Sequence, residues 1–297
     1  MADRLPPSRV IRTQHQDTKA RRKAWKSLVS PAPSRGWCLG GQLCCLLLAL
    51  SACSAFPATP PATLSVYAAA SLSEAFTQIG QSFESGRPGT RVTFNFAGSQ
   101  QLAQQLAQGA PADVFASANL QQMDAVVEAG RVRAGAQVVF ARNRLVVIFP
   151  KDNPAGLRTL ADLARPGLRL VLAAQEVPAG RYALEFLERA SQDSGFGSTF
   201  KDDTLRNVVS YEENVRAALS KVVLGEADAG IVYTSDVDRS APVGQLDIPS
   251  ALNPVASYWI APITDSAHPR LAQDFIDSVL SPAGQAVLVQ YGFMPDH

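Results

Sequence analysis

The sequence predicts an α/β protein of two lobes, each a mostly parallel sheet flanked by helices, with a cleft between the lobes. Three observations lead to this prediction. From Leu64 onward, short apolar runs alternate with segments of helical periodicity, which is typical of helices layered on parallel sheets. The 234 residues from Leu64 to His297 exceed one compact core. Small residues recur where strands lead into helices, at the sheet edge where such proteins bind ligands.

Residues 1–53 are predicted to be a signal peptide. They hold nine of the 27 Lys and Arg residues and end in the apolar run LCCLLLAL, which is too short to span a bilayer. The next letters, LSAC, resemble a lipobox, so we expect Cys53 to be lipidated and to become the first residue of the mature chain. A plain signal cleavage nearby, with Cys53 incidental, is the alternative.

Residues 54–63 follow as an extended tether rich in Pro, Ala and Thr, with a reach of roughly 30 Å at ~3.1 Å per residue. Beyond residue 53 the chain carries 18 basic and 24 acidic residues. This acidic balance, without a basic stripe or basic–aromatic interleaving, argues against a nucleic-acid partner.

The predicted elements alternate along the rest of the chain. After the apolar run at Leu64, strands are expected at RVTFNF, ADVFAS, RLVVIFP, RLVLAA and DAGIVY, and helices after Ser71, Ser99, Asn119, Ala179 and Asn214. The strand-like run around Arg142 suggests the crossing between lobes, and residues 254–263 suggest the return. We therefore expect lobe 1 to comprise residues 64–141 plus 264–297, ending in two helices broken at Ser281, and lobe 2 to comprise residues 142–263.

Four strand-to-helix junctions share one feature, which is a space kept clear by small residues. In AAASL, Ser71 stands three residues before Glu74, as in a capping box, while Gly98 and Ser99 open the next such helix. Taken singly, these junctions are ordinary helix caps and loops. The other two junctions are Pro178–Ala179 and Asn214–Val215. Together, helix N-termini that point into one cleft would bind an anion without Lys or Arg, because their N–H groups are unpaired and carry partial positive charge.

The residue inventory argues against an enzyme. All four cysteines lie in the leader, so the remainder has no disulfide, thiolate metal site or cysteine nucleophile. Of the three histidines only His268 is neither in the leader nor terminal, and we expect it at the surface. A hydrolase using Ser71 or Ser99 would lack a histidine base, and neither serine stands in a GxSxG turn.

The stretches AAASL, AGSQQLA, GAPADVFASA, EVPAG, ENVRAAL, DAGIVYTSD and QYGF together resemble the molybdate-binding proteins of ABC-type transporters, over residues 64–293. The resemblance implies a type II periplasmic-binding-protein fold that holds molybdate, or tungstate, between its lobes, with no cofactor and no direct protein–metal ligand. The implied anion ligands are Ser71, Ser99, Ala179, Val215 and Tyr233.

The resemblance also implies a monomer in the periplasm, or in the cell envelope if Cys53 anchors it, with a membrane permease and an ATPase as partners. The chain departs from the family in its Ala97-Gly98-Ser99 turn, which is richer in serine in many relatives, and in its lipobox, since many relatives are soluble.

The alternatives are a binding protein for another small anion, such as sulfate or an organic carboxylate, and a scaffold that has lost its ligand. A shell made only of donors disfavours phosphate, which keeps a proton near neutral pH, and a site sized for molybdate leaves the bonds to the smaller sulfate long. Arg181 and Arg216 would favour a carboxylate if they entered the cleft, but we expect both to face solvent. The small residues at all four junctions argue against the scaffold.

Overall fold

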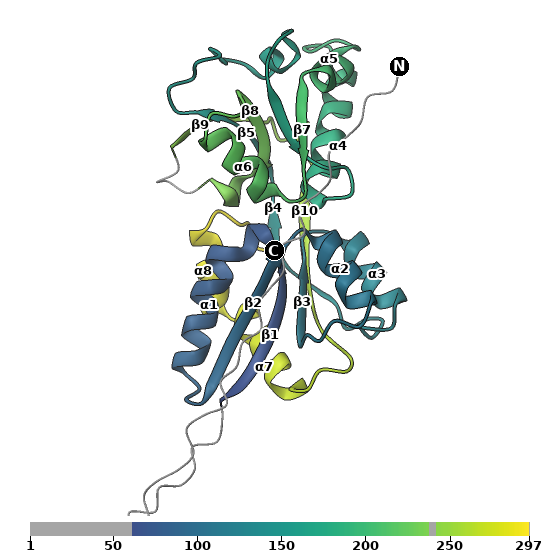
Figure 1. The fold of residues 1–297 in the computed structure, drawn as a ribbon, viewed down its shortest axis with the longest axis vertical. Coiled ribbons are helices and arrows are strands. Elements are labelled where there is room, and N and C mark those ends of the chain that lie inside the picture. The colour runs from purple at the N-terminus through teal and green to yellow at the C-terminus, as the bar shows by residue number, and fades with distance from the viewer. Residues whose placement is uncertain (1–60, 238–241, 297) are drawn as a thin grey trace, which may run out of the picture. The chain divides into compact units, whose positions relative to one another are not determined.

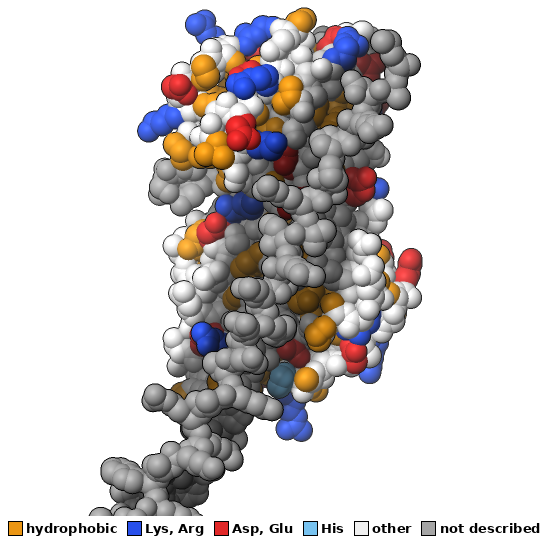
Figure 2. All heavy atoms as spheres, in the orientation of Figure 1, with side chains coloured by type: hydrophobic (Ala, Val, Ile, Leu, Met, Phe, Trp, Pro, Cys, Tyr) orange, Lys and Arg blue, Asp and Glu red, His pale blue; other side chains and the backbone are white. Residues whose placement is uncertain are grey.

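The computed structural model describes residues 61–237 and 242–296. The predicted signal peptide, Cys53 and most of the predicted tether lie outside the described residues. Within the part described, no helix is both long and apolar enough to cross a membrane. On the face drawn in Figure 2, basic and acidic side chains are interspersed over the described surface.

The first sheet has the strand order β2-β1-β3-β10-β4 (Figure 1). Strand β1 pairs in parallel with β2 and β3, whereas β10 is antiparallel to β3 and β4, so β10 alone opposes the other strands of this sheet. The register sets Ala69 beside Ala97, which brings the ends of β1 and β2 together. The bounds are β1 (Ala62–Ala69), β2 (Thr90–Ala97), β3 (Val114–Ser117), β4 (Val138–Asn143) and β10 (Ala256–Pro262).

Helices cover both faces of this sheet, and together they form lobe 1 (Figure 1). A 3₁₀ turn, η1 (Ala70–Leu72), leads directly from β1 into the first helix. The helices are α1 (Ser73–Ser85), α2 (Ser99–Ala107), α3 (Leu120–Glu128), α7 (Pro269–Leu280) and α8 (Pro282–Gln290). The core between them includes Phe76 and Phe83, whose ring centroids lie 5.9 and 5.4 Å from that of Phe275 on α7.

The second sheet has the order β7-β6-β8-β5-β9 and the same mixed character. Strands β7, β6 and β8 are parallel, and β5 is antiparallel to both β8 and β9. Its strands are β5 (Leu145–Pro150), β6 (Leu170–Ala173), β7 (Val208–Glu212), β8 (Ala229–Tyr233) and β9 (Val243–Asp247). Lobe 2 is completed by α4 (Pro178–Gln192), α5 (Phe200–Arg206), α6 (Val215–Val223), η2 (Leu160–Ala164) and η3 (Thr234–Asp236).

The predicted strands and helices are all present, and in each sheet one strand opposes the others, so the mostly parallel sheets are confirmed. The final helix pair breaks as expected at Ser281, whose hydroxyl accepts the Gly284 N–H at 3.1 Å. Apart from the 3₁₀ turns, three of the described elements were not predicted. Two are β7 and β9, whose residues are mostly half-buried or exposed, and the third is the seven-residue α5.

The chain crosses from the first sheet to the second in one short step and returns through a longer one. Strand β4 ends at Asn143 and β5 begins at Leu145, so the first crossing lies close to the position expected near Arg142. The return differs from the expected boundary at residue 263, because β10 pairs wholly within the first sheet and the crossing precedes Ala256. An apolar strand at a crossing can pair with either sheet, and its sequence does not say which. Asn253 braces the crossings by bonding both the N–H and the carbonyl of Leu145, at 3.0 and 2.8 Å.

Candidate functional site

The four junctions surround one small cavity, whose walls come from both lobes. The space between these walls, counted together with the part open to solvent, is about 220 Å³. Among the described residues, no charged side chain lines the cavity. Its lining comprises Ala69, Ala70, Ser71, Ala97, Gly98, Ser99, Ala118, Val177, Pro178, Ala179, Asn214, Val215 and Tyr233. All five residues implied by the resemblance are therefore brought together.

Ser71 lies in the η1 turn, immediately beyond the carboxyl end of β1, and is 3% exposed. The predicted capping box with Glu74 does not form, because η1 displaces Ser71 from the start of the α-helix and neither η1 nor α1 has a side-chain cap. Instead, Ser71 Oγ lies 2.8 Å from the phenol oxygen of Tyr258 on β10, and Glu74 accepts a hydrogen bond from Ser73. Ser71 is thus free of any capping role.

Ser99 is the first residue of α2 and is 1% exposed. The preceding Gly98 is extended, with φ −60° and ψ 136°, so no side chain caps the start of α2. The Ser99 hydroxyl accepts the backbone N–H of Ala118 at 3.1 Å. A backbone N–H can only donate, so the hydrogen of this hydroxyl remains available to another acceptor.

The second lobe contributes two helix starts, those of α4 and α6. Ala179 follows Pro178 in the first turn of α4. A proline fits the first position of a helix because a backbone N–H there would have no partner within the helix. Val215 begins α6, and the side chain of Asn214 caps that helix by accepting the Ala217 N–H at 3.0 Å. Ser71, Ser99, Ala179 and Val215 each lie in the first turn of a helix, where backbone N–H groups have no acceptor within the helix.

Tyr233 is the last residue of β8 and is 1% exposed, yet its hydroxyl has no hydrogen-bond partner among the described residues. Burial raises the pKa of this phenol well above its usual value, so the group keeps its proton. An unpaired buried hydroxyl costs about 1–3 kcal/mol, which makes its position on the cavity wall informative. The Tyr233 hydroxyl is therefore available to donate a hydrogen bond to a ligand.

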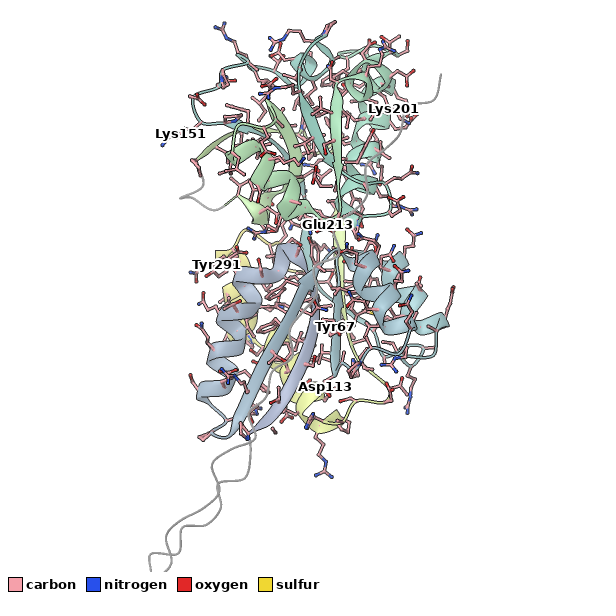
Figure 3. All side chains as sticks on the ribbon, viewed as in Figure 1. Tyr67, Asp113, Lys151, Lys201, Glu213 and Tyr291 are labelled. Atoms are coloured by element: carbon pink, nitrogen blue, oxygen red, sulfur yellow. The ribbon has the colours of Figure 1, made fainter. Side chains whose placement is uncertain are left out.

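Contacts between the lobes close the cavity. Gln100 donates to the carbonyl of Glu213 at 2.8 Å, and Gln101 donates to its carboxylate at 3.0 Å; Figure 3 labels Glu213. A Cβ on Gly98 would stand 2.6 Å from the same carbonyl, so a glycine is needed for this approach. Since the lining is almost fully buried, a ligand must enter through an opening of the lobes.

Arg216 was expected to face solvent, and this prediction is wrong. Its side chain is 25% exposed and forms an ion pair with Glu74 of lobe 1, while its Nε lies 3.0 Å from Oδ1 of the fully buried Asp236. These two carboxylates hold the guanidinium away from the cavity lining. Arg181 is exposed, as expected.

Sequence reasoning missed three residues next to the site. Ala118, in the turn after β3, belongs to the lining. Tyr258 contacts Ser71 and Asp236 contacts Arg216, both from outside the lining. Tyr258 stands 187 positions from Ser71, and a tyrosine within an apolar strand carries no local signal of such a contact. No cluster of His, Cys, Asp and Glu suited to a metal ion occurs within residues 61–237 and 242–296.

Comparisons with known proteins identify relatives over most of the chain. The model of the bacterial extracellular solute-binding protein family matches residues 64–294. The molybdate-binding protein ModA of Mycobacterium tuberculosis H37Rv is 42% identical over 257 residues, which cover 84% of this chain and 94% of that protein.

Two solved structures share the fold. The periplasmic molybdate-binding protein of Azotobacter vinelandii has a TM-score of 0.68 at 20% identity, covering 79% of this chain and all of that one. The sulfate-binding protein SubI of M. tuberculosis has a TM-score of 0.71 at 19% identity, covering 79% of this chain and 87% of that one. The fold alone therefore does not separate the two anions.

The buried Asp236 leads to a prediction about pH. Burial raises its pKa from 3.8 to about 6, against the opposing attraction of Arg216. The folded chain therefore keeps this proton to a higher pH than the unfolded chain, and the carboxyl's contribution to stability is lost as pH rises from about 4 to 6. In Asp236→Asn this loss should disappear. We expect the stability of the variant relative to wild type to increase across that window, by no more than about 3 kcal/mol.

Urea unfolding of both proteins at several pH values measures this difference. Asp247→Asn, which removes one exposed carboxylate, is the matched control. A difference between Asp236→Asn and wild type that stays constant from pH 4 to 7, or that changes in the opposite direction, would contradict the prediction.

Proposed function

This chain belongs to the bacterial extracellular solute-binding protein family, and we propose that it is the molybdate-binding component of an ABC-type transporter. In this role it captures molybdate, and tungstate as well, outside the inner membrane and delivers the anion to a permease driven by an ATPase. The family is one of transport proteins rather than enzymes, in agreement with the absence of a hydrolytic triad in the sequence.

The observation that carries the proposal is the unpaired hydroxyl of Tyr233 in a cavity walled by donors. The hydroxyls of Ser71 and Ser99 and the N–H groups of Ala179 and Val215 complete the proposed shell. A small dianion with oxygens on all sides satisfies every one of these donors at once, whereas water or an organic solute would leave some unpaired. Molybdenum is then held through its oxygens, without a direct protein–metal ligand.

The strength of such a site follows from its hydrogen bonds. A hydrogen bond to a charged group contributes roughly 1.5–3 kcal/mol, and helix N-termini add favourable electrostatics. Five such bonds, less the cost of association, correspond to affinities from micromolar to nanomolar, or about −8 to −12 kcal/mol.

The arginines argue against an organic carboxylate as ligand. Arg181 is exposed, and Arg216 is held by Glu74 and Asp236, so neither supplies the bidentate cation that carboxylates favour. Sulfate is the closer competitor, because it is also a fully ionised tetrahedral dianion. We propose that it binds more weakly, since its shorter bonds leave the donors of the two lobes too far from its oxygens.

The proposed donors come from both lobes, so binding and closure are coupled. We propose a monomer that opens to admit the anion and is held closed by it, because the ligand favours the state in which both sets of donors reach it. The contacts of Gln100, Gln101 and Arg216 across the lobes support the closed form.

Calorimetry of the purified protein with four anions tests the proposal. We expect molybdate and tungstate to bind with micromolar or tighter affinity, sulfate at least tenfold more weakly, and phosphate more weakly still, because protonated phosphate presents a donor to donors. Sulfate binding more tightly than molybdate would replace this proposal with a sulfate-binding function.

Tyr233→Phe separates a ligand donor from a structural hydroxyl. Removing a buried hydroxyl that has no protein partner should leave the melting temperature of the empty protein unchanged or raise it. The same change should weaken molybdate binding about tenfold to a hundredfold, because one charge-assisted hydrogen bond is lost. Tyr211→Phe, at a tyrosine that is 54% exposed, is the matched control. Wild-type affinity in Tyr233→Phe would exclude this hydroxyl from the site.

The lipid anchor is a separate proposal that rests on LSAC and the Pro-rich segment after it. Cys53→Ala should release the protein from the membrane fraction or block its maturation, without changing the molybdate affinity of the purified protein. Fractionation of cells that express wild type or the variant provides the measurement. If wild type is already recovered in the soluble periplasmic fraction, Cys53 is not an anchor.

A further inference from the structure

We propose that Tyr258 is a positioning residue that sets the selectivity of the site: it turns the hydrogen of the Ser71 hydroxyl toward the bound anion, and thereby excludes oxyanions that carry a proton. The inference rests on the proposed function and names the residue behind one part of its specificity. Tyr258 lies outside the cavity lining and is linked to it by its contact with Ser71, while its ring also packs edge-on against that of Tyr233, with centroids 5.8 Å apart.

The contact is buried and rigid. Tyr258 is fully buried on β10, and its phenol oxygen lies 2.8 Å from Ser71 Oγ. Aromatic rings hold it on several sides, edge-on to Phe293 with centroids 5.2 Å apart and to Phe140 at 6.2 Å. A phenol fixed in this way presents its hydroxyl to Ser71 at a constant position.

The direction of this hydrogen bond decides what Ser71 offers the ligand. If Ser71 donated to Tyr258, its only hydrogen would be used and its lone pairs would face the cavity. If Tyr258 donates, the Ser71 hydrogen is free for the ligand. Burial holds the pKa of Tyr258 far above its usual range, so the phenol keeps a proton to donate. A dianion in the cavity favours this second direction, because it gives Ser71 a charge-assisted bond.

Ser99 shows the same arrangement with a donor whose direction is certain. Its hydroxyl accepts the backbone N–H of Ala118 at 3.1 Å, so its hydrogen is also free. In the proposed arrangement both serines of the cavity are backed by a donor, a main-chain N–H behind Ser99 and a phenol behind Ser71. A main-chain N–H cannot be removed by substitution, whereas the phenol of Tyr258 can.

The consequence concerns protonated oxyanions. Near neutral pH phosphate keeps a proton and needs an acceptor for it, which a Ser71 hydroxyl held as a donor does not offer. Without the Tyr258 hydroxyl, the Ser71 hydroxyl can rotate and present a lone pair to that proton. Tyr258→Phe should therefore admit phosphate, while molybdate, which needs donors only, is affected much less.

The test compares four purified proteins by calorimetry near neutral pH with molybdate and with inorganic phosphate: wild type, Tyr258→Phe, Ser71→Ala and the double variant. Tyr258→Phe should lower the ratio of the phosphate to the molybdate dissociation constant about tenfold. Ser71→Ala should weaken molybdate binding yet keep phosphate excluded. Adding Tyr258→Phe to Ser71→Ala should change neither affinity further, because Tyr258 acts through Ser71.

Each outcome has a distinct meaning. Failure of wild type to bind molybdate overturns the proposed function and this inference with it. If wild type binds molybdate but Tyr258→Phe keeps the wild-type ratio, or lowers it equally in the Ser71→Ala background, only the role of Tyr258 is overturned. The melting temperature shows whether Tyr258→Phe folds. If it does not, Ser71→Ala alone decides, since wild-type molybdate affinity in that variant would contradict a donor role for Ser71 and with it the role of Tyr258.

Discussion

The constraint on which the site depends is that buried polar groups must be paired. The cavity gathers the N–H groups at several helix starts, two serine hydroxyls and the phenol of Tyr233, and these groups are almost all donors. Donors cannot satisfy one another, so the closed lobes hold a set of unmet hydrogen bonds. The ligand that meets them best is one with acceptors on every side and no hydrogen of its own. In the proposed function, one arrangement of donors therefore selects both the charge and the protonation state of the anion.

The neutral walls of the cavity have a second effect. Binding a dianion with Lys or Arg would make the empty site strongly charged and would attract anions of many kinds, including carboxylates. Here the guanidinium of Arg216, the residue after Val215, is paired with Glu74 and lies beside the buried Asp236, and it joins the two lobes instead of entering the cavity. Positive potential at the site then comes from helix termini, whose direction is fixed by the fold.

The serines also show how a fold gives a direction to a hydroxyl group. A free serine can donate or accept, and a site lined with free serines would tolerate a protonated ligand. In this chain the turn after β3 supplies the donor behind Ser99, and β10 supplies Tyr258 behind Ser71. Strand β10 lies between β3 and β4, so its tyrosine reaches Ser71 because β10 joins the first sheet and not the second.

Local sequence determined much of this protein. The alternation of apolar runs and helical segments predicted the α/β layers. The small residues before Ser71 and Ser99, together with the helix starts at Ala179 and Val215, indicated the proposed anion site, because space and free N–H groups are local properties of a helix start. What the sequence alone did not provide were contacts between distant segments. The pairing of β10, the Tyr258 hydroxyl behind Ser71 and the ion pairs of Arg216 join residues that are far apart in the chain. Only the tertiary structure decides them, since a strand, a phenol or a guanidinium has the same local signature whichever partner it meets.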